Sequence, residues 1–183
     1  VVKTAALRNG LYACFSPKPI PGQAGNGMHI NMSVKCSDGT DRSEAFLAGV
    51  LAHVREITAF LNPSEESYRR FGEMKAPRYI TWSPENRSQL IRIPAAKGEY
   101  RRIELRSPDP TANPYLAYAL LIRAGLDGIQ KGMLPPQPVN ENLYTAPRSL
   151  TDALEQLPSS LTEAKQIARS SPFVTAILPD AML

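Results

Sequence analysis

The sequence has only two cysteines and two histidines in 183 residues, and it has no long apolar run. Two cysteines, Cys14 and Cys36, are too few for a disulfide framework and lack the spacing of a metal site. Such sparse cysteine use is typical of a reducing compartment, so we expect a cytoplasmic protein with free thiols. No apolar run approaches the ~20 residues that cross a bilayer, and no secretory signal is visible, so we expect no membrane partner.

Neither sign of charge dominates the chain, which has 21 basic and 17 acidic residues and a net charge of +4. Eight of the arginines fall between residues 69 and 106, several of them between apolar residues. A nonspecific nucleic-acid surface more often mixes Lys and Arg with stacking aromatics, so we expect no nucleic-acid partner. Arginines fixed on strands favour small anions instead, because the planar guanidinium binds oxyanions at defined angles.

Hydrophobic residues make up 43% of the chain and charged residues 21%, which is typical of a globular domain with one core. The chain begins at Val1 rather than at a methionine, in a stretch that we expect to be strand or loop. We therefore expect a fragment of a longer protein.

Alternation of polar and apolar residues predicts strands over residues 11–16, 28–35, 79–83, 89–94 and 100–106. Lys97-Gly98-Glu99 is expected to close a hairpin between the last two. In the last strand Arg102, Glu104 and Arg106 share one face, because successive side chains point to opposite sides. A carboxylate between two guanidinium groups should stay ionised. The alternative is a solvated ladder of salt bridges with no function.

The strand over 28–35 carries His29, Asn31 and Ser33 on one face, directly after a loop with Gly25 and Gly27. Glycine lets a ligand approach the backbone closely, so this face is a candidate binding surface. The alternative is an ordinary exposed edge strand. Neutral imidazole is a common metal ligand, but a lone histidine is weak support. His29 becomes a candidate ligand if a carboxylate such as Glu104 lies beside it.

Helical periodicity predicts a helix over residues 44–61, capped by Ser43, with His53 as a packing residue. Asn113 and Pro114 predict the start of a second helix over 114–130, which is apolar nearly all round and so is expected to be buried. Residues 64–78 are expected to form a loop, and two short helices are expected near 152–157 and 161–168. The predicted fold class is α+β, a largely antiparallel sheet with helices packed on its apolar face.

Several motifs, in order along the chain, resemble glutamine synthetase. They are GNGMH at 25–29, NRS at 86–88, IRIP at 91–94, RIELRSPDP at 102–110, ANPYL at 112–116 and AGLDG at 124–128. Several independent motifs in one order are far more specific than a single glycine pattern. The resemblance implies that residues 1–183 are the C-terminal portion of a glutamine synthetase catalytic domain. It also implies that the N-terminal domain and the upstream catalytic strands are absent.

The resemblance implies ATP-dependent ligation of ammonia to the side-chain carboxylate of glutamate, through a γ-glutamyl phosphate intermediate. It further implies ATP and Mg²⁺ or Mn²⁺ as cofactors, and a homo-oligomer of stacked rings for the full-length protein. The ligands of one metal match His29 and Glu104. Arginines that contact the ATP phosphates match Arg87 and Arg92, and a nucleotide-side arginine matches Arg102.

The substrate side of the resemblance involves other residues. Arg70 and Arg106 match arginines that bind the carboxylates of glutamate or the developing phosphate, and Gly25 matches a loop position that contacts glutamate. Ser33 matches an adenine-side contact, and Asn31 stands where many members carry histidine. Arg87 and Arg106 are therefore the expected catalytic arginines.

The chain departs from the family pattern in the mobile loop over the site. A glutamate usually precedes the Ala-Pro pair and receives a proton from ammonium, but here Lys75 precedes Ala76-Pro77. Glu73 is expected to substitute as a catalytic residue. The departure leaves open a γ-glutamyl–amine ligase of the same fold that uses a different amine. The third alternative is an inactive nucleotide-binding or oligomerisation fragment, because one His and one Glu do not complete the metal sites.

Overall fold

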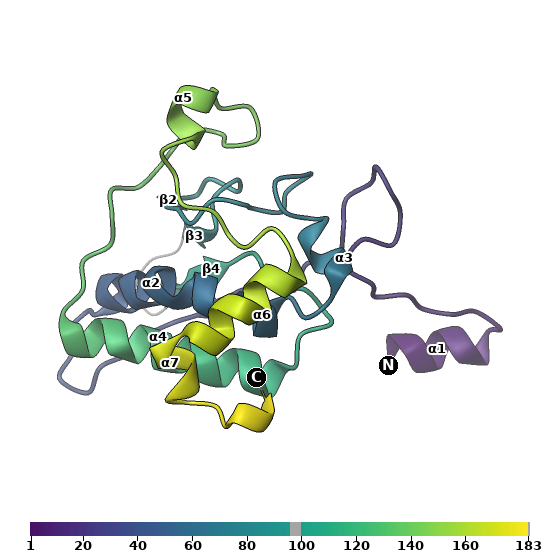
Figure 1. Ribbon diagram of the computed structural model, residues 1–183, viewed down its shortest axis with the longest axis horizontal. Coiled ribbons are helices and arrows are strands. Elements are labelled where there is room, and N and C mark those ends of the chain that lie inside the picture. The colour runs from purple at the N-terminus through teal and green to yellow at the C-terminus, as the bar shows by residue number, and fades with distance from the viewer. Residues whose placement is uncertain (96–99, 183) are drawn as a thin grey trace.

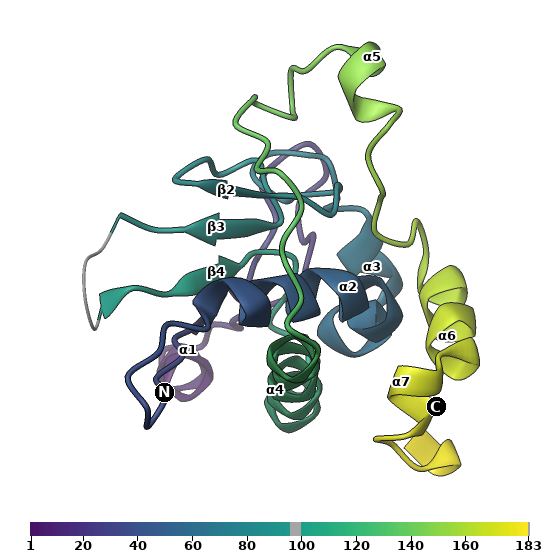
Figure 2. The same ribbon diagram turned by 90° about the vertical axis from the view of Figure 1, so that its left-hand side faces the viewer.

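A computed structural model describes residues 1–95 and 100–182, and in it a small sheet lies over two long helices (Figure 1 and Figure 2). The elements are α1 (Val2–Arg8), β1 (Ile30–Met32), α2 (Ser43–Leu61), α3 (Glu65–Tyr68), β2 (Trp82–Pro84), β3 (Ile91–Ile93), β4 (Ile103–Leu105), α4 (Pro114–Lys131), α5 (Arg148–Thr151), α6 (Leu161–Ser170), α7 (Pro172–Thr175) and the 3-10 helix η2 (Asp180–Met182). This arrangement confirms the predicted α+β class. None of the helices in the described ranges is long and apolar enough to cross a membrane.

The sheet has the strand order β1-β4-β3-β2. β4 pairs antiparallel with both β1 and β3, whereas β2 pairs parallel with β3, so the sheet is largely antiparallel, as predicted. The register sets Glu104 opposite Asn31 on one side and opposite Arg92 on the other. Because paired residues point to the same face, these three polar side chains form a row across the sheet.

The core lies between the sheet and helices α2 and α4, which Figure 2 shows packed beneath the strands. Helix α2 buries one continuous face there, including Val50, Val54 and Ile57. The two helices approach closely because both carry glycine where they cross. A Cβ added at Gly49 would lie 2.2 Å from the carbonyl oxygen of Ala124, and one at Gly128 would be equally close to a carbonyl oxygen of α2. No other residue fits at either position without moving the backbone.

Helix α4 confirms the predicted start at Asn113, whose side chain accepts a hydrogen bond from the backbone N–H of Tyr115. The expectation of complete burial is wrong. The side of α4 turned away from α2 is open to solvent, with Tyr118, Ile122 and Leu126 each more than 40% exposed. An apolar composition predicted burial, but α2 covers only one side of α4.

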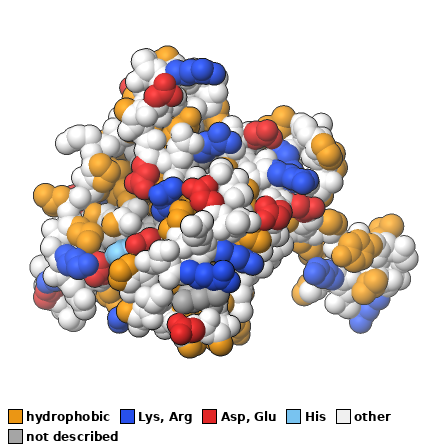
Figure 3. Space-filling model, in the orientation of Figure 1, with side chains coloured by type: hydrophobic (Ala, Val, Ile, Leu, Met, Phe, Trp, Pro, Cys, Tyr) orange, Lys and Arg blue, Asp and Glu red, His pale blue; other side chains and the backbone are white. Residues whose placement is uncertain are grey.

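The N-terminal part differs most from expectation. Residues 2–8 form α1, not strand or loop, and this helix buries none of its residues. It projects from the body in Figure 1, and its apolar and basic side chains are exposed on the lobe at the right of Figure 3. The strand predicted over residues 11–16 is absent, because no neighbouring strand pairs with it among the described residues and Leu11 and Phe15 remain exposed.

The remaining strands are shorter than predicted, and three helix expectations need correction. Ser64 caps α3, a helix within the predicted loop 64–78, by accepting a hydrogen bond from the backbone of Ser67. Ser43 does not cap α2; instead its own N–H donates to the carboxylate of Asp41. The helix expected near 152–157 lies earlier, as α5, whereas the expected helix over 161–168 is confirmed as α6. The predicted hairpin turn at 97–99 lies outside the described residues.

Candidate active site

A hollow of about 420 Å³ opens on the polar face of the sheet, where the strands meet the loops around residues 25 and 75. Seven of the residues expected at the site line it: Gly25, His29, Arg70, Arg87, Arg92, Glu104 and Arg106. These seven come from five separate segments of sequence, and the fold brings them together. The lining of the hollow is strongly basic, because four arginines and Lys75 surround the single carboxylate of Glu104. Such a surface binds polyanions.

Glu104 lies at the centre of this lining, with its side chain only 10% exposed. Its Oε2 atom accepts a hydrogen bond from Nε of Arg92 at 2.6 Å and another from Nη1 of Arg106 at 3.0 Å. Burial alone would raise the pKa of Glu104, but the two arginines outweigh it and lower the pKa to about 2. The carboxylate is therefore ionised at any pH above the acid range.

His29 faces the other oxygen of the same carboxylate. Its Nδ1 atom lies 3.4 Å from Oε1 of Glu104. A carboxylate therefore lies beside this histidine, which makes His29 a candidate metal ligand. Burial and the positive charge of Arg106 lower the pKa of His29, and the Glu104 carboxylate only partly opposes this. The imidazole is therefore neutral near pH 7, the form in which histidine binds metals.

A divalent metal fits this pair in donor chemistry. Mg²⁺ is usually held by one or two carboxylates together with phosphates and waters, and Mn²⁺ accepts imidazole as well. Glu104 has one oxygen free of the arginines, and His29 offers a ring nitrogen beside it. No group of three or more His, Cys, Asp or Glu residues that could hold a metal occurs within residues 1–95 and 100–182. The pair therefore supplies only part of a coordination shell.

Arg106 joins the sheet to the loop at the mouth of the hollow. It is buried, and its Nη2 atom donates a hydrogen bond to the backbone oxygen of Lys75 at 3.3 Å. In this loop Met74 and Lys75 both adopt positive φ angles, of 39° and 80°. Residues other than glycine rarely adopt such backbone angles. Backbone strain of this kind is concentrated at functional sites. Sequence reasoning did not single out Met74, which also lines the hollow, because nothing in the sequence marks its conformation.

Arg87 lies in a turn between β2 and β3 and lines the hollow from there. A distant segment holds this turn: Asn86 donates to the backbone oxygens of Asn140 and Glu141 at 2.6 and 3.1 Å. The backbone N–H of Leu143 in turn donates to the hydroxyl of Ser88. The sequence does not mark residues 140–143 for this role, since backbone acceptors leave no pattern in the sequence.

Four expected residues do not line the hollow. Arg102 donates through Nε to the side-chain oxygen of Asn31 at 3.1 Å, farther along the same face of the sheet. Ser33 lines a different hollow beyond the end of β1. Glu73 is exposed and forms an ion pair with Lys18 at 3.0 Å. The expected catalytic position of Glu73 is therefore not adopted in this structure.

The whole sequence, residues 1–183, matches the family described as "Glutamine synthetase, catalytic domain". It is 42% identical over 194 residues to a glutamine synthetase of Methanosarcina mazei, an alignment that covers 97% of this chain and 43% of the relative. A glutamine synthetase of Staphylococcus epidermidis is 43% identical over 186 residues, covering 93% of this chain and 42% of the relative. The chain thus spans less than half the length of these relatives.

Solved structures show the same relationship. A GmaS–ADP complex superimposes with a TM-score of 0.84 at 34% identity, covering 98% of this chain and 45% of that one. A GmaS structure without ligand gives a TM-score of 0.82 at the same identity, covering 98% and 44%. Matching motifs, a match along the full sequence and a shared fold agree, and the chain belongs to the glutamine synthetase family of ligases.

Proposed function

We propose that this chain is the C-terminal portion of the catalytic domain of an ATP-dependent glutamate–ammonia ligase. In the full-length protein the reaction joins ammonia to the side-chain carboxylate of glutamate through γ-glutamyl phosphate and releases ADP and phosphate. Family membership and the basic hollow support this proposal. We further propose that the full-length protein is a cytoplasmic homo-oligomer of stacked rings, as the family resemblance implies.

The hollow supplies charge where such a reaction needs it. Phosphoryl transfer depends mainly on positioning and on neutralising the charge of the phosphate oxygens. In our proposal Arg87 and Arg92 contact the phosphates of ATP, and Arg106 stabilises the phosphoryl group as it is transferred. Because Arg92 and Arg106 both donate to Glu104, one carboxylate fixes the orientation of an arginine proposed to bind ATP and of an arginine proposed to be catalytic.

His29 and Glu104 are the proposed protein ligands of a Mg²⁺ or Mn²⁺ ion. A metal at this point neutralises phosphate charge. Arg70 and Gly25 are proposed to hold glutamate, because Arg70 lies behind the loop backbone at residues 25 and 27 and leaves no space for a larger side chain at Gly25. Asn31, Ser33 and Arg102 are proposed to contact the nucleoside, beyond the hollow and away from the loop around residue 75.

The contact of Glu104 with His29 on one oxygen and with two arginines on the other carries the proposal. A salt-bridge ladder without function would not need a neutral histidine in the same hollow. The test is to assay the full-length protein for ADP formation that requires both glutamate and ammonia, and to repeat it after Glu104→Gln. A protein that needs neither substrate, or a variant with normal activity, would overturn the proposal.

A second candidate, a γ-glutamyl–amine ligase, is favoured by the loop at the mouth of the hollow. Lys75 lines the hollow, whereas Glu73, the residue expected to receive a proton from ammonium, is paired with Lys18 outside it. Such an enzyme would keep the ATP and glutamate contacts and change only the amine. Full-length protein that consumes ATP with glutamate and a primary amine, but not with ammonia, would favour this candidate.

A third candidate is a nucleotide-binding or assembly fragment without turnover of its own. It is favoured by the partial metal site, since His29 and Glu104 are joined by no third ligand among the described residues. On this view the purified 183-residue chain forms no glutamine under conditions in which the full-length protein does. Measurable glutamine formation by the short chain would exclude it.

A further inference from the structure

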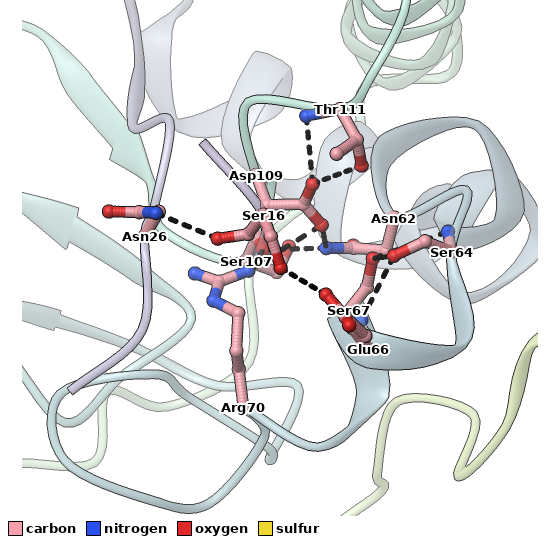
Figure 4. Close-up of polar contacts among 10 residues, drawn as sticks. All are labelled: Ser16, Asn26, Asn62, Ser64, Glu66, Ser67, Arg70, Ser107, Asp109 and Thr111. Carbon is pink, nitrogen blue, oxygen red and sulfur yellow. Dashed lines mark hydrogen bonds and ion pairs between the residues drawn. The ribbon is translucent and has the colours of Figure 1, made fainter. Parts of the chain in front are cut away.

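Arg70, proposed to bind glutamate, is itself held from behind by a buried network (Figure 4). Only 3% of its surface is exposed, and its Nη1 atom donates a hydrogen bond to the backbone oxygen of Ser107 at 3.0 Å. The same atom lies 3.7 Å from Oδ2 of Asp109. Its other terminal nitrogen, Nη2, is directed toward the loop, where a Cβ at Gly27 would lie 3.0 Å from it. One arm is therefore fixed and the other faces the hollow.

Asp109 is completely buried, and the polar partners of its carboxylate are all donors. The backbone N–H and hydroxyl of Thr111 donate to its Oδ1 atom, and Nδ2 of Asn62 donates to its Oδ2 atom at 3.0 Å. Asn62, also fully buried, donates in addition to the backbone oxygen of Ser107 at 2.9 Å. Asn62 and Arg70 thus contact the same two oxygens, Arg70 through a hydrogen bond to Ser107 and an ion pair with Asp109. Figure 4 shows their side chains converging on Ser107 and Asp109.

A buried guanidinium needs a counter-charge, because burial otherwise penalises the charged form. Burial lowers the pKa of Arg70, and the charge of Asp109 opposes that shift. Only a carboxylate satisfies the donors on both sides of Asp109. An asparagine there would place an NH₂ group against either Thr111 or the pair of Asn62 and Arg70.

We propose that Asp109, assisted by Asn62, is a positioning residue that fixes one arm of Arg70 and so directs the other toward the carboxylate of the bound amino acid. This role rests on the proposed function, in which Arg70 binds glutamate. It assigns Asp109 no contact with substrate, and it predicts an effect on glutamate that spares ATP.

The test compares Asp109→Asn with Asp38→Asn in the full-length protein. Asp38 is a matched control, because its Oδ1 atom also accepts from the backbone and hydroxyl of a threonine two residues on, but at the surface. We expect Asp109→Asn to raise KM for glutamate about tenfold, with KM for ATP unchanged and kcat within about threefold. The control should change none of these. An equal rise in KM for glutamate and for ATP, or an unchanged KM for glutamate, would overturn the proposal.

Thermal unfolding of the same protein supplies a readout that does not depend on activity. Asp109→Asn and Arg70→Met should each lower the melting temperature, and the double variant should lose less than the sum of the two shifts, since both remove one interaction. Additive shifts would contradict coupling between the two residues. If the full-length protein shows no glutamate-dependent turnover, the proposed function fails, whereas this cycle still decides whether Asp109 acts on Arg70.

If Asp109→Asn does not fold, Asn62→Ala takes its place. Alanine is smaller than asparagine, so it fits at this buried position, and it donates to neither Ser107 nor Asp109. We expect KM for glutamate to rise about threefold with KM for ATP unchanged, because Arg70 keeps its counter-charge and loses only its neighbour in the network. An unchanged KM for glutamate in this variant would overturn the proposal.

Discussion

Nδ1 of His29 lies 3.4 Å from Oε1 of Glu104, although the two residues come from segments far apart in the chain. The antiparallel pairing of β1 with β4 brings them together, and the basic hollow opens over them. The proposed metal site depends on this pair.

The first prediction concerns Glu104→Gln in the full-length protein. Glutamine keeps the shape but removes the charge that holds Arg92 and Arg106, and it is a poorer metal ligand. We expect activity to fall by about 100-fold or more, with a higher metal concentration needed for half-maximal rate. Activity assays against metal concentration check this. Glu44→Gln, which removes an exposed carboxylate from α2, is the control and should behave as wild type.

The second prediction concerns acid stability. The folded pKa of Glu104 is about 2, below its ordinary value of 4.5, so its contribution to the free energy of unfolding is complete above about pH 4.5. That contribution, on the order of 3 kcal/mol, is lost as the pH falls from about 4.5 to 2. Urea unfolding at pH 6 and pH 3 should show a smaller pH effect for Glu104→Gln than for wild type. The same pH effect in both would contradict the assigned pKa.

The third prediction concerns Gly25→Ala. An added Cβ would lie 2.3 Å from the backbone oxygen of Pro17 and 2.9 Å from Cγ of Arg70, so either the loop or Arg70 must move. We expect KM for glutamate to rise by about tenfold or more, because a displaced Arg70 misplaces its binding arm. Gly39→Ala meets no atom within 4 Å, although φ is 75° there, and should cost about 1 kcal/mol of stability without changing KM.

The fourth prediction concerns Lys75→Glu. This change places a carboxylate at the mouth of the hollow, where a positive charge now lies. If the amine is ammonia, the variant should use it at least as well as wild type, because a carboxylate attracts ammonium and accepts its proton. If the natural amine differs, the variant should shift its preference toward ammonia. Rates with ammonia and with a panel of primary amines measure this. A lower rate with ammonia, or an unchanged preference in an enzyme that prefers another amine, would exclude Lys75 as a determinant.

The fifth prediction tests the packing of α2 on α4. Gly49→Ala would drive a methyl group against a carbonyl oxygen 2.2 Å away, and we expect a loss of roughly 1–3 kcal/mol of stability. Gly132→Ala, at the C-terminal end of α4 with no atom within 4 Å, should lose only about 1 kcal/mol from its left-handed backbone. Urea unfolding compares the two, and equal losses would contradict the close crossing.

The sequence predicted the fold best where helical periodicity extended over many residues. Helices α2 and α4 fall within one residue of expectation, since 18 or 19 residues of helical period outweigh local ambiguity. It failed over residues 11–16, where short alternation found no strand to pair with. Alternation states which face is apolar, but not whether a partner exists to bury it.

The site was predicted less evenly. Seven expected residues line one hollow. Strand register accounts for Arg92 and Glu104, which pair across the sheet and so share a face. The support behind those residues was not foreseen. Asp109 and Asn62 are ordinary turn and helix-end residues in the sequence, and only the folded chain brings them behind Arg70.

Glutamine formation by the full-length protein, from glutamate, ammonia and ATP with Mg²⁺ or Mn²⁺, tests the central claim most directly. We predict equal amounts of glutamine, ADP and phosphate, and loss of all three after Glu104→Gln. ATP consumption that does not depend on glutamate, or glutamine formation unaffected by Glu104→Gln, would contradict the assignment of this hollow as the active site.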